Sequence, residues 1–162
     1  SIVPSLLFVG EQCGRAEEAI EFYTSVFDDS AIGPIARYGS DQPPNDPDTV
    51  MYAEFTLAGQ QFAAMDSAQD HAFGFTEAVS LGVDCADQDE VDRLWATLTS
   101  QGGSPEECGW LTDRFGVSWQ IVPSVLPELL ADADEARAER VMEAMLAMSK
   151  LDVESLLDAA EG

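Results

Sequence analysis

The hydrophobic positions of this chain alternate between strand-like and helix-like spacing. Ile2–Val9 is an apolar run of strand length, and Ala16–Phe27 carries apolar residues at the spacing of one helical face. Ile32–Tyr38 predicts a second strand. Val50–Leu57 and Gln61–Asp66 flank a short turn that contains a glycine, which predicts a hairpin. The first part of the chain is therefore expected to form a strand, a helix and three further strands.

The same order returns in the second part of the chain. Ala78–Asp84 has the composition of a strand, and Asp87–Gln101 has the periodicity of a helix. Asp87 followed by Glu90 resembles a capping box at the start of this helix. Cys108–Thr112 and Val117–Val122 surround a tight turn and predict another hairpin. The chain thus reads as two copies of one unit.

Beyond Pro123 the pattern becomes helical. Apolar residues form one stripe, and acidic residues occupy the other positions; a shorter helix is expected over Val153–Ala159. This tail predicts an appendage that covers the repeated body or stabilises a dimer. The stripe consists of Ala138, Val141, Met142, Met145 and Met148.

Length and composition fit a globular protein with an ordinary core. The chain has 162 residues, of which 46% are hydrophobic. We expect a domain over residues 1–126, with modules at about 1–68 and 75–126, and a helical extension over 127–162. The sequence contains no apolar run long enough to cross a bilayer and no leader-like start, so we expect a cytoplasmic protein without membrane partners.

The charge is strongly negative. The chain has 31 acidic and 7 basic residues, a formal net charge of −24. Such a surface repels phosphate backbones, so nucleic acid partners are disfavoured. The acids are spread over the whole chain and Lys150 is the only lysine. This pattern favours a halophilic protein adapted to high salt, and an ordinary acidic protein is the alternative.

The cysteines are Cys13, Cys85 and Cys108, an odd number without a C-x-x-C pair. This spacing signals neither a disulfide framework nor a zinc site, and it favours free thiols in a reducing compartment. A reactive Cys108 beside Trp110 is the alternative.

Four segments together resemble a known family. They are similar to the vicinal oxygen chelate superfamily, which includes glyoxalases, bleomycin resistance proteins and dioxygenases, and most of all to its PhnB-like branch, labelled 3-demethylubiquinone methyltransferase-like. The resemblance implies an α+β fold with two βαβββ modules that form a curved mixed sheet around a concave pocket, usually completed by a homodimer. The segments are Ala16–Tyr23 (AEEAIEFY), Phe75–Ser80 (FTEAVS), Cys108–Pro123 (CGWLTDRFGVSWQIVP) and Arg140–Leu146 (RVMEAML).

The resemblance also implies a divalent metal held by the first and last strands of the modules. Matching those strands puts Pro4 and Ala78, Ala63 or Ala64, and Gln120 at the ligand positions. Only Gln120 carries a donor, and one neutral oxygen is too few for such an ion. We therefore expect no metal and no cofactor. The single histidine, His71, lies in a loop and is expected to be a solvated or packing residue.

Strand alternation predicts which side chains face the pocket. Val79, Leu81 and Val83 should face the helix and leave Ser80 on the concave side. Likewise Trp119 should pack inward, with Ser118 and Gln120 facing the pocket. Trp110 could stack on a ligand or belong to the core. The predicted ligand-binding residues are therefore Ser80, Trp110, Ser118 and Gln120.

In the first module, Met51, Ala53, Phe55 and Leu57 form the apolar set of one strand, opposed by Tyr52, Glu54 and Thr56. Glu54 becomes the carboxylate nearest the middle of the concave face, where burial could raise its pKa for acid–base work. A solvated Glu54, or one paired with Arg37 or Arg114, is the alternative.

Three functions follow from these residues. The first is a metal-free module that binds a small, partly apolar molecule. The second is an enzyme that acts on a small metabolite with Glu54 or Tyr52 as catalytic groups. Metal-dependent lyase or dioxygenase chemistry and methyl transfer are less favoured, the latter because the chain has no Gly-rich loop between a strand and a helix for a nucleotide-like cofactor.

Overall fold

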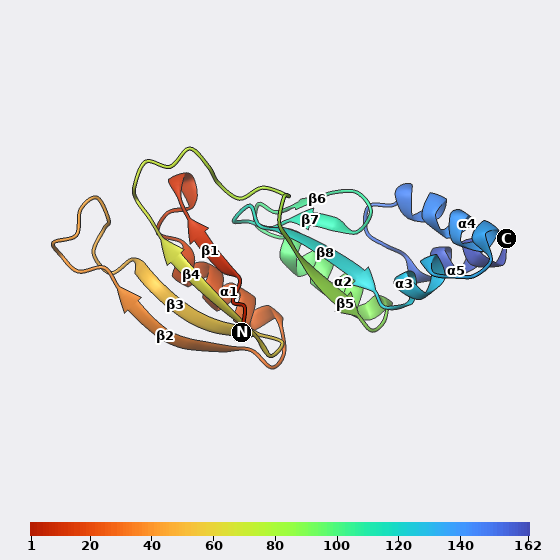
Figure 1. The fold of residues 1–162 in the computed structure, drawn as a ribbon, viewed down its shortest axis with the longest axis horizontal. Helices are drawn as coiled ribbons and strands as arrows, with labels where there is room; N and C mark the ends of the chain where they lie inside the picture. Colours follow the sequence, from red (N-terminus) through yellow and green to blue (C-terminus); the bar gives the residue numbers. More distant parts are fainter. The chain divides into compact units, whose positions relative to one another are not determined.

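The computed structural model describes residues 1–162, which divide into two compact units, Ser1–Gly74 and Phe75–Gly162. Each unit contains one four-stranded sheet with a helix packed on it (Figure 1). The two sheets have the same strand order, so each unit can be described by itself in the same terms.

The first unit has the element order βαβββ. Its strands lie in the order β1-β4-β3-β2, with β1 parallel to β4 and the other neighbours antiparallel. A short 3-10 helix, Gly10–Gln12, precedes α1. The elements are β1 (Ser5–Phe8), α1 (Ala16–Val26), β2 (Ala31–Arg37), β3 (Val50–Leu57) and β4 (Gln60–Asp66).

The second unit repeats this arrangement and adds helices at its end. The strand order is β5-β8-β7-β6, with β5 parallel to β8. The α+β class with two βαβββ modules is therefore confirmed. The repeated elements are β5 (Ser80–Cys85), α2 (Gln88–Thr99), β6 (Ser104–Pro105), β7 (Trp110–Thr112) and β8 (Ser118–Pro123).

The core of the first unit lies between α1 and the sheet. Ile20 and Tyr23 on α1 are buried, and so are Phe55 and Phe62 on β3 and β4. Phe55 and Phe62 are register partners, and their rings stack with centroids 5.5 Å apart. The apolar helix face predicted from the sequence is thus the buried one, because it covers the face of β3 and β4 that carries these aromatics.

The expected alternation along β3 is interrupted at its start. Ala53, Phe55 and Leu57 are buried as predicted, but Met51 is 40% exposed and Val50 is buried instead. The pairing of β2 with β3 shifts by one residue between Ala36 and Arg37. This bulge puts Val50 on the buried face of β3 and Met51 on the exposed face, so the assignment of Met51 to the helix-facing set was wrong.

The core of the second unit is built in the same way. Leu94 and Leu98 of α2 are fully buried, as are Leu111 and Ile121 on the sheet. Trp119 is buried on the helix-covered face, as expected. Val79 was expected there too but is 77% exposed. That assignment was wrong because β5 begins at Ser80, two residues after the predicted start at Ala78, so Val79 lies outside the strand.

The start of α2 has the predicted cap. The Asp87 carboxylate accepts a hydrogen bond from the Glu90 amide at 2.9 Å, and the Glu90 carboxylate accepts one from the Ala86 amide at 2.8 Å. Both bonds satisfy N–H groups that lack a partner within the helix. The capping box predicted from Asp87 and Glu90 is therefore present. Its second donor is the Ala86 amide, whereas in the usual motif it is the amide of the cap residue, here Asp87.

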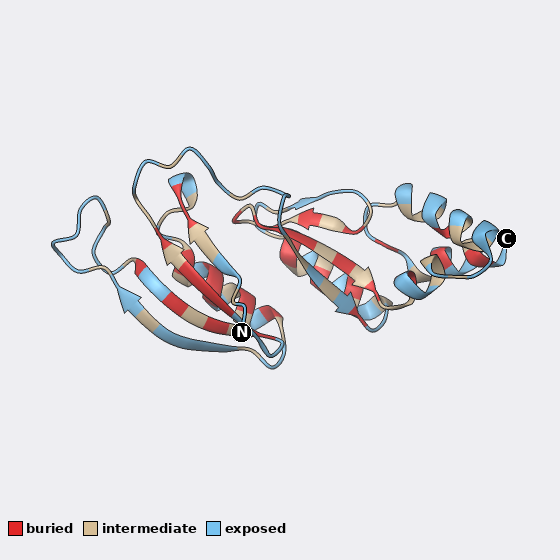
Figure 2. Ribbon diagram, in the orientation of Figure 1, coloured by how far each residue is buried: buried red, intermediate tan, exposed pale blue.

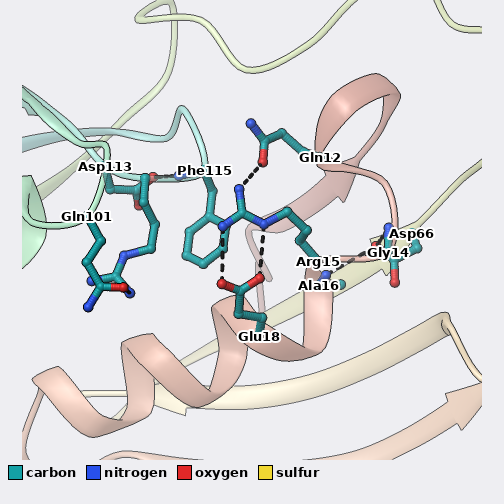
Figure 3. Close-up of polar contacts among 10 residues, drawn as sticks. Gln12, Gly14, Arg15, Ala16, Glu18, Asp66, Gln101, Asp113 and Phe115 are labelled. Carbon is teal, nitrogen blue, oxygen red and sulfur yellow. Dashed lines mark hydrogen bonds and ion pairs between the residues drawn. The ribbon is translucent and has the colours of Figure 1, made fainter.

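Each unit also contains one buried carboxylate. Asp66, at the end of β4, accepts hydrogen bonds from the amides of Gly14, Ala16 and Val50. These bonds fasten the start of α1 and the start of β3 to β4. Figure 3 shows Asp66 beside Gly14 and Ala16. Asp66 therefore serves the first turn of α1 in place of a local cap, since the residue before that helix makes no side-chain cap bond.

Asp113 is the buried carboxylate of the second unit. It lies in the turn between β7 and β8 and accepts hydrogen bonds from the amides of Phe115 and Val117 and from the Trp119 indole, at 2.9 to 3.0 Å. Gly116, with φ of +91°, completes the turn. The tight turn predicted from the sequence is thus held by the side chain of Asp113.

The extension after β8 folds into three helices, α3 (Val125–Leu130), α4 (Glu135–Leu146) and α5 (Val153–Glu161). Of the predicted apolar stripe, Val141 is buried, whereas Met142 is 40% exposed, so its place in the buried stripe was wrong. The helices belong to the second unit and share a small core with the end of β8. That core consists of Leu126, Val141, Leu151, Leu156 and Ala160, with Val122 packed against it.

None of the helices is both long enough and apolar enough to cross a lipid bilayer.

Candidate functional site

The four predicted ligand-binding residues lie on one face of the second sheet, opposite the face that α2 covers. The register pairs Ser80 with Ser118, and Gln120 with Trp110. Because paired residues point to the same face, strand alternation brings all four to one surface. The structure therefore brings these predicted residues together, and their role in binding stays a prediction.

Polar contacts order this surface. The Gln120 amide nitrogen donates a hydrogen bond to the Ser80 hydroxyl at 2.9 Å. Ser118 is buried, whereas Ser80, Gln120 and Trp110 are half-buried. This surface therefore has two parts. The polar part is the Gln120 amide held by the Ser80 hydroxyl, and the aromatic part is the Trp110 indole opposite it.

Beside these residues the second unit contains an open pocket with a volume of about 640 Å³. Trp110 and Thr112 line it from β7, and Thr112 is the register partner of Ser118. Sequence reasoning missed Thr112, although its place two residues after Trp110 puts it on the same face. The remaining lining residues are Glu77, Glu106, Glu107 and Cys108.

The candidate catalytic residues lie in the first unit. Glu54 and Tyr52 are both on β3, where Tyr52 is 42% exposed and Glu54 is half-buried. Glu54 lines an open groove of about 370 Å³ together with Thr56 and Gln61, which are register partners. Glu54 thus lines a groove, and the catalytic role of Glu54 and Tyr52 stays a prediction.

The β2 strand forms the other side of this groove. It is exposed along nearly its whole length (Figure 2). Its backbone approaches β3 so closely at Gly33 that a Cβ atom there would lie 2.8 Å from the Glu54 carbonyl oxygen. Only glycine fits this approach, so Gly33 helps to define the groove.

The divalent metal implied by the family does not fit the residues present. Pro4, Ala63 or Ala64, and Ala78 offer no side-chain donor, and the Gln120 amide is engaged with Ser80. No group of three or more His, Cys, Asp or Glu side chains is placed to hold an ion. A metal with the usual imidazole and carboxylate ligands has no matching donor set at these positions.

Cys13, Cys85 and His71 are not among the residues that line the pocket. Burial raises the pKa of Cys85 to about 12 and also raises the pKa of Cys13, so both thiols stay protonated near neutrality. His71 shares a hydrogen bond of 2.8 Å with the Ser67 hydroxyl and packs against Phe73. His71 is thus a packed loop residue.

The repeated βαβββ module places the chain in the glyoxalase-fold class, and comparisons with known proteins agree. A putative 3-demethylubiquinone-9 3-methyltransferase, a PhnB protein from Bacillus cereus, is 41% identical, with a TM-score of 0.69 over 76% of this chain and 98% of that chain. A protein from Pseudomonas aeruginosa is 25% identical, with a TM-score of 0.63 over 76% of this chain and 96% of that chain. No curated protein matches the chain.

Residues 1–122 match the family described as 3-demethylubiquinone-9 3-methyltransferase. The chain belongs to this family, and the PhnB-like resemblance seen in the sequence is confirmed. The match ends near the end of β8, so α3, α4 and α5 lie beyond it.

Proposed function

We propose that this PhnB-like chain is a binding module that holds a small, partly apolar molecule against the second sheet without a metal ion. The observation that carries the proposal is the pocket of about 640 Å³ beside Trp110. Its volume lies within the range of roughly 300–1,000 Å³ typical of small-molecule sites. The residues that would bind are Ser80, Trp110, Ser118 and Gln120.

The chemistry of the lining favours a particular kind of ligand. Within the lining, the Trp110 indole offers an apolar face for stacking. Gln120, the register partner of Trp110, and Ser80 lie beside the lining on the same face of the sheet and offer hydrogen-bonding groups. Three glutamates, Glu77, Glu106 and Glu107, surround the same space and would repel anions. A ligand with an aromatic part and no negative charge matches this lining.

Three monosubstituted benzenes of different charge test the proposal. Benzyltrimethylammonium, benzyl alcohol and benzoate would be titrated by calorimetry into the full chain. We expect the affinity to fall in that order, with a Kd of roughly 1 mM or tighter for the cation. Trp110→Leu should weaken it about tenfold, and Trp95→Leu on α2 serves as a matched control. Absence of saturable binding, or equal affinity in Trp110→Leu, would overturn the proposal.

A second candidate is an enzyme that acts through Glu54 or Tyr52. It is favoured by the groove in which the Glu54 side chain lies beside Thr56 and Gln61. Small-metabolite extract would be incubated with the chain and followed by proton NMR. We expect Glu54→Gln and Tyr52→Phe to slow any turnover at least a hundredfold if these groups transfer the proton. Turnover that survives both substitutions would remove this candidate.

We also propose that the chain forms a homodimer, as the family resemblance implies. Sedimentation of the purified chain at several concentrations tests this state directly. A single species with the mass of one chain, about 17.5 kDa, at all concentrations would contradict it.

A further inference from the structure

We propose that the segment joining α4 to α5, Met148–Val153, positions the residues that line the pocket of the second unit. We call this segment the strap, and Glu106–Trp110 the pocket loop. The inference rests on the proposed function, because it gives the strap a role in the ligand site. The strap lies beyond the part of the chain that matches the family, residues 1–122, and the pocket loop lies within it.

The pocket loop has a strained backbone that needs outside support. Cys108 has φ of +57° and is followed by Gly109 at +85°, so two consecutive residues are left-handed. For a residue with a Cβ atom this conformation is unfavourable, and it persists only where the surroundings impose it. Within the loop, the Glu106 amide donates to the Trp110 carbonyl and the Trp110 amide to the Glu107 carbonyl.

The strap supplies that support through three hydrogen bonds. The amide of Cys108 donates to the Met148 carbonyl at 2.9 Å, and the amide of Gly109 donates to the Ser149 carbonyl at 2.8 Å. The Ser149 hydroxyl donates to the Glu106 carbonyl at 2.5 Å. Both amides of the left-handed pair are therefore held by the strap.

Packing adds to these bonds. Leu151 is fully buried, and it lies so close to Gly109 that a Cβ atom there would be 2.9 Å from the Leu151 Cδ1 atom. The Gly109 carbonyl also accepts a hydrogen bond from the Ile121 amide in β8 at 2.8 Å. The loop is thus fixed between the strap on one side and β8 on the other.

Helix α2 in turn holds the strap. The Gln88 side chain donates to the Leu151 carbonyl at 3.0 Å and accepts from the Val153 amide at 2.7 Å. Lys150, the only lysine, forms an ion pair with Asp92 at 2.7 Å. Since Gln88 itself lies outside the pocket lining, it acts on the pocket only through the strap, which makes it a positioning residue.

Most of the pocket lining depends on the strap. Four of the residues that line the pocket, namely Glu106, Glu107, Cys108 and Trp110, belong to the pocket loop. Their positions therefore depend on a segment that follows them by about forty residues, with helix α2 as its anchor. The indole and the thiol reach the pocket in the orientation that the strap imposes.

The test uses the full chain with Gln88→Ala, which removes both hydrogen bonds from Gln88 to the strap, and Ser149→Ala, which removes the bond to Glu106. Amide hydrogen exchange would be measured by NMR. We expect exchange at Cys108 and Gly109 to accelerate about five- to thirtyfold, as expected when one or two hydrogen bonds are lost. The Val117 amide, which donates to Asp113 and not to the strap, should stay unchanged.

Two further readouts connect the loop to the pocket. Alkylation of Cys108 by iodoacetamide, followed by peptide mass spectrometry, should accelerate by a similar factor, while Cys13 in the first unit keeps its rate. The affinity for benzyltrimethylammonium should fall about threefold or more in Gln88→Ala. Asp89→Ala, at the next position of α2 and exposed, is the matched control.

The outcomes separate this inference from the proposed function. Unchanged exchange at Cys108 and Gly109 in both variants would overturn the proposed role of the strap. Equal acceleration at the Val117 amide would also overturn it, because that result indicates a general loosening of the second unit. Exchange and alkylation need no ligand. If the three aromatic probes fail to bind while the exchange result holds, the proposed function is contradicted, and the strap remains the element that orients the pocket loop.

Discussion

The two modules share one topology but present different open faces. In the first module β2 and β3 have seven and eight residues, and Glu54 lies in a groove along them. In the second module β6 and β7 have only two and three residues, and the larger pocket lies beside them. The same fold thus yields a long exposed sheet edge in one case and a loop-bordered pocket in the other.

The difference shows how a repeated fold acquires a specialised site. With strands this short, Glu106–Cys108 lie outside the sheet, and the side chains of these residues line the pocket. Backbone that leaves a sheet loses its ladder hydrogen bonds and must find other partners. In the second module the extension provides partners for Glu106 and Cys108, whereas in the first module β2 and β3 pair along most of their length, with shifts in register.

The largest expected effect concerns the two buried carboxylates, one in each module. Asp66→Asn and Asp113→Asn should each lower the free energy of unfolding by about 3 kcal/mol, because an amide group would face N–H donors where a carboxylate oxygen now accepts. Urea denaturation measures the change. Asp70→Asn, at an exposed loop position, is the control and should change it by less than about 0.5 kcal/mol. Neutral results at Asp66 or Asp113 would contradict this reading of the two carboxylates.

Salt should act on both modules. With a net charge of −24, the folded chain repels itself in dilute buffer, and mobile ions screen that repulsion. If the acidity reflects a halophilic source, the thermal midpoint should rise by roughly 10 °C between 0.1 and 2 M KCl. Differential scanning calorimetry gives the midpoint. A thermal midpoint that is the same at 0.1 and 2 M KCl would contradict the halophilic interpretation.

A matched pair of glycines tests the contrast between the sheets. Gly33→Ala should destabilise the chain by about 2 kcal/mol, because the new Cβ atom would lie 2.8 Å from the Glu54 carbonyl oxygen. Gly82→Ala in β5 should be neutral or slightly stabilising, because no atom lies within 4 Å of the added carbon. Thermal unfolding of both variants compares them directly. Equal losses at the two positions would mean that the β2–β3 approach is not tight.

The smallest effect is a pH dependence of the second module. The hydrogen bond from Lys150 lowers the pKa of Asp92, and the Ser155 amide lowers the pKa of Asp152. A depressed pKa in the folded state gives stability that is present above the ordinary value of 3.8 and is lost as the pH falls through the lower folded value. Hydrogen exchange between pH 2.5 and 5 should therefore show the strap losing protection below about pH 3.8. Protection in α1 provides the comparison.

The elements that the sequence predicted are those with strong local signals. Helix α2 shows its cap and apolar face, and the β7–β8 turn carries Asp113 and Gly116. By contrast β6, with two residues, is too short to produce a periodic pattern. The bulge at Met51 and the late start of β5 at Ser80 come from strand pairing, which local alternation does not contain.

The candidate site shows the same limit. Alternation along β5 and β8 placed Ser80 and Gln120 on one face, because a strand fixes the direction of every second side chain. The pocket-lining glutamates lay beyond this reasoning, since Glu106 and Glu107 are in a loop with no period. Contacts with residues such as Ser149 that lie far along the chain determine the position of that loop.

The division of the chain at Gly74 has an optical consequence. All three tryptophans, Trp95, Trp110 and Trp119, lie in the second unit, and all three tyrosines lie in the first. Light absorbed only by indole therefore reports on the second unit alone, and tyrosine emission originates entirely in the first. The unfolding of each unit can therefore be followed in one sample by its intrinsic fluorescence, from tryptophan for the second unit and from tyrosine for the first, without any label.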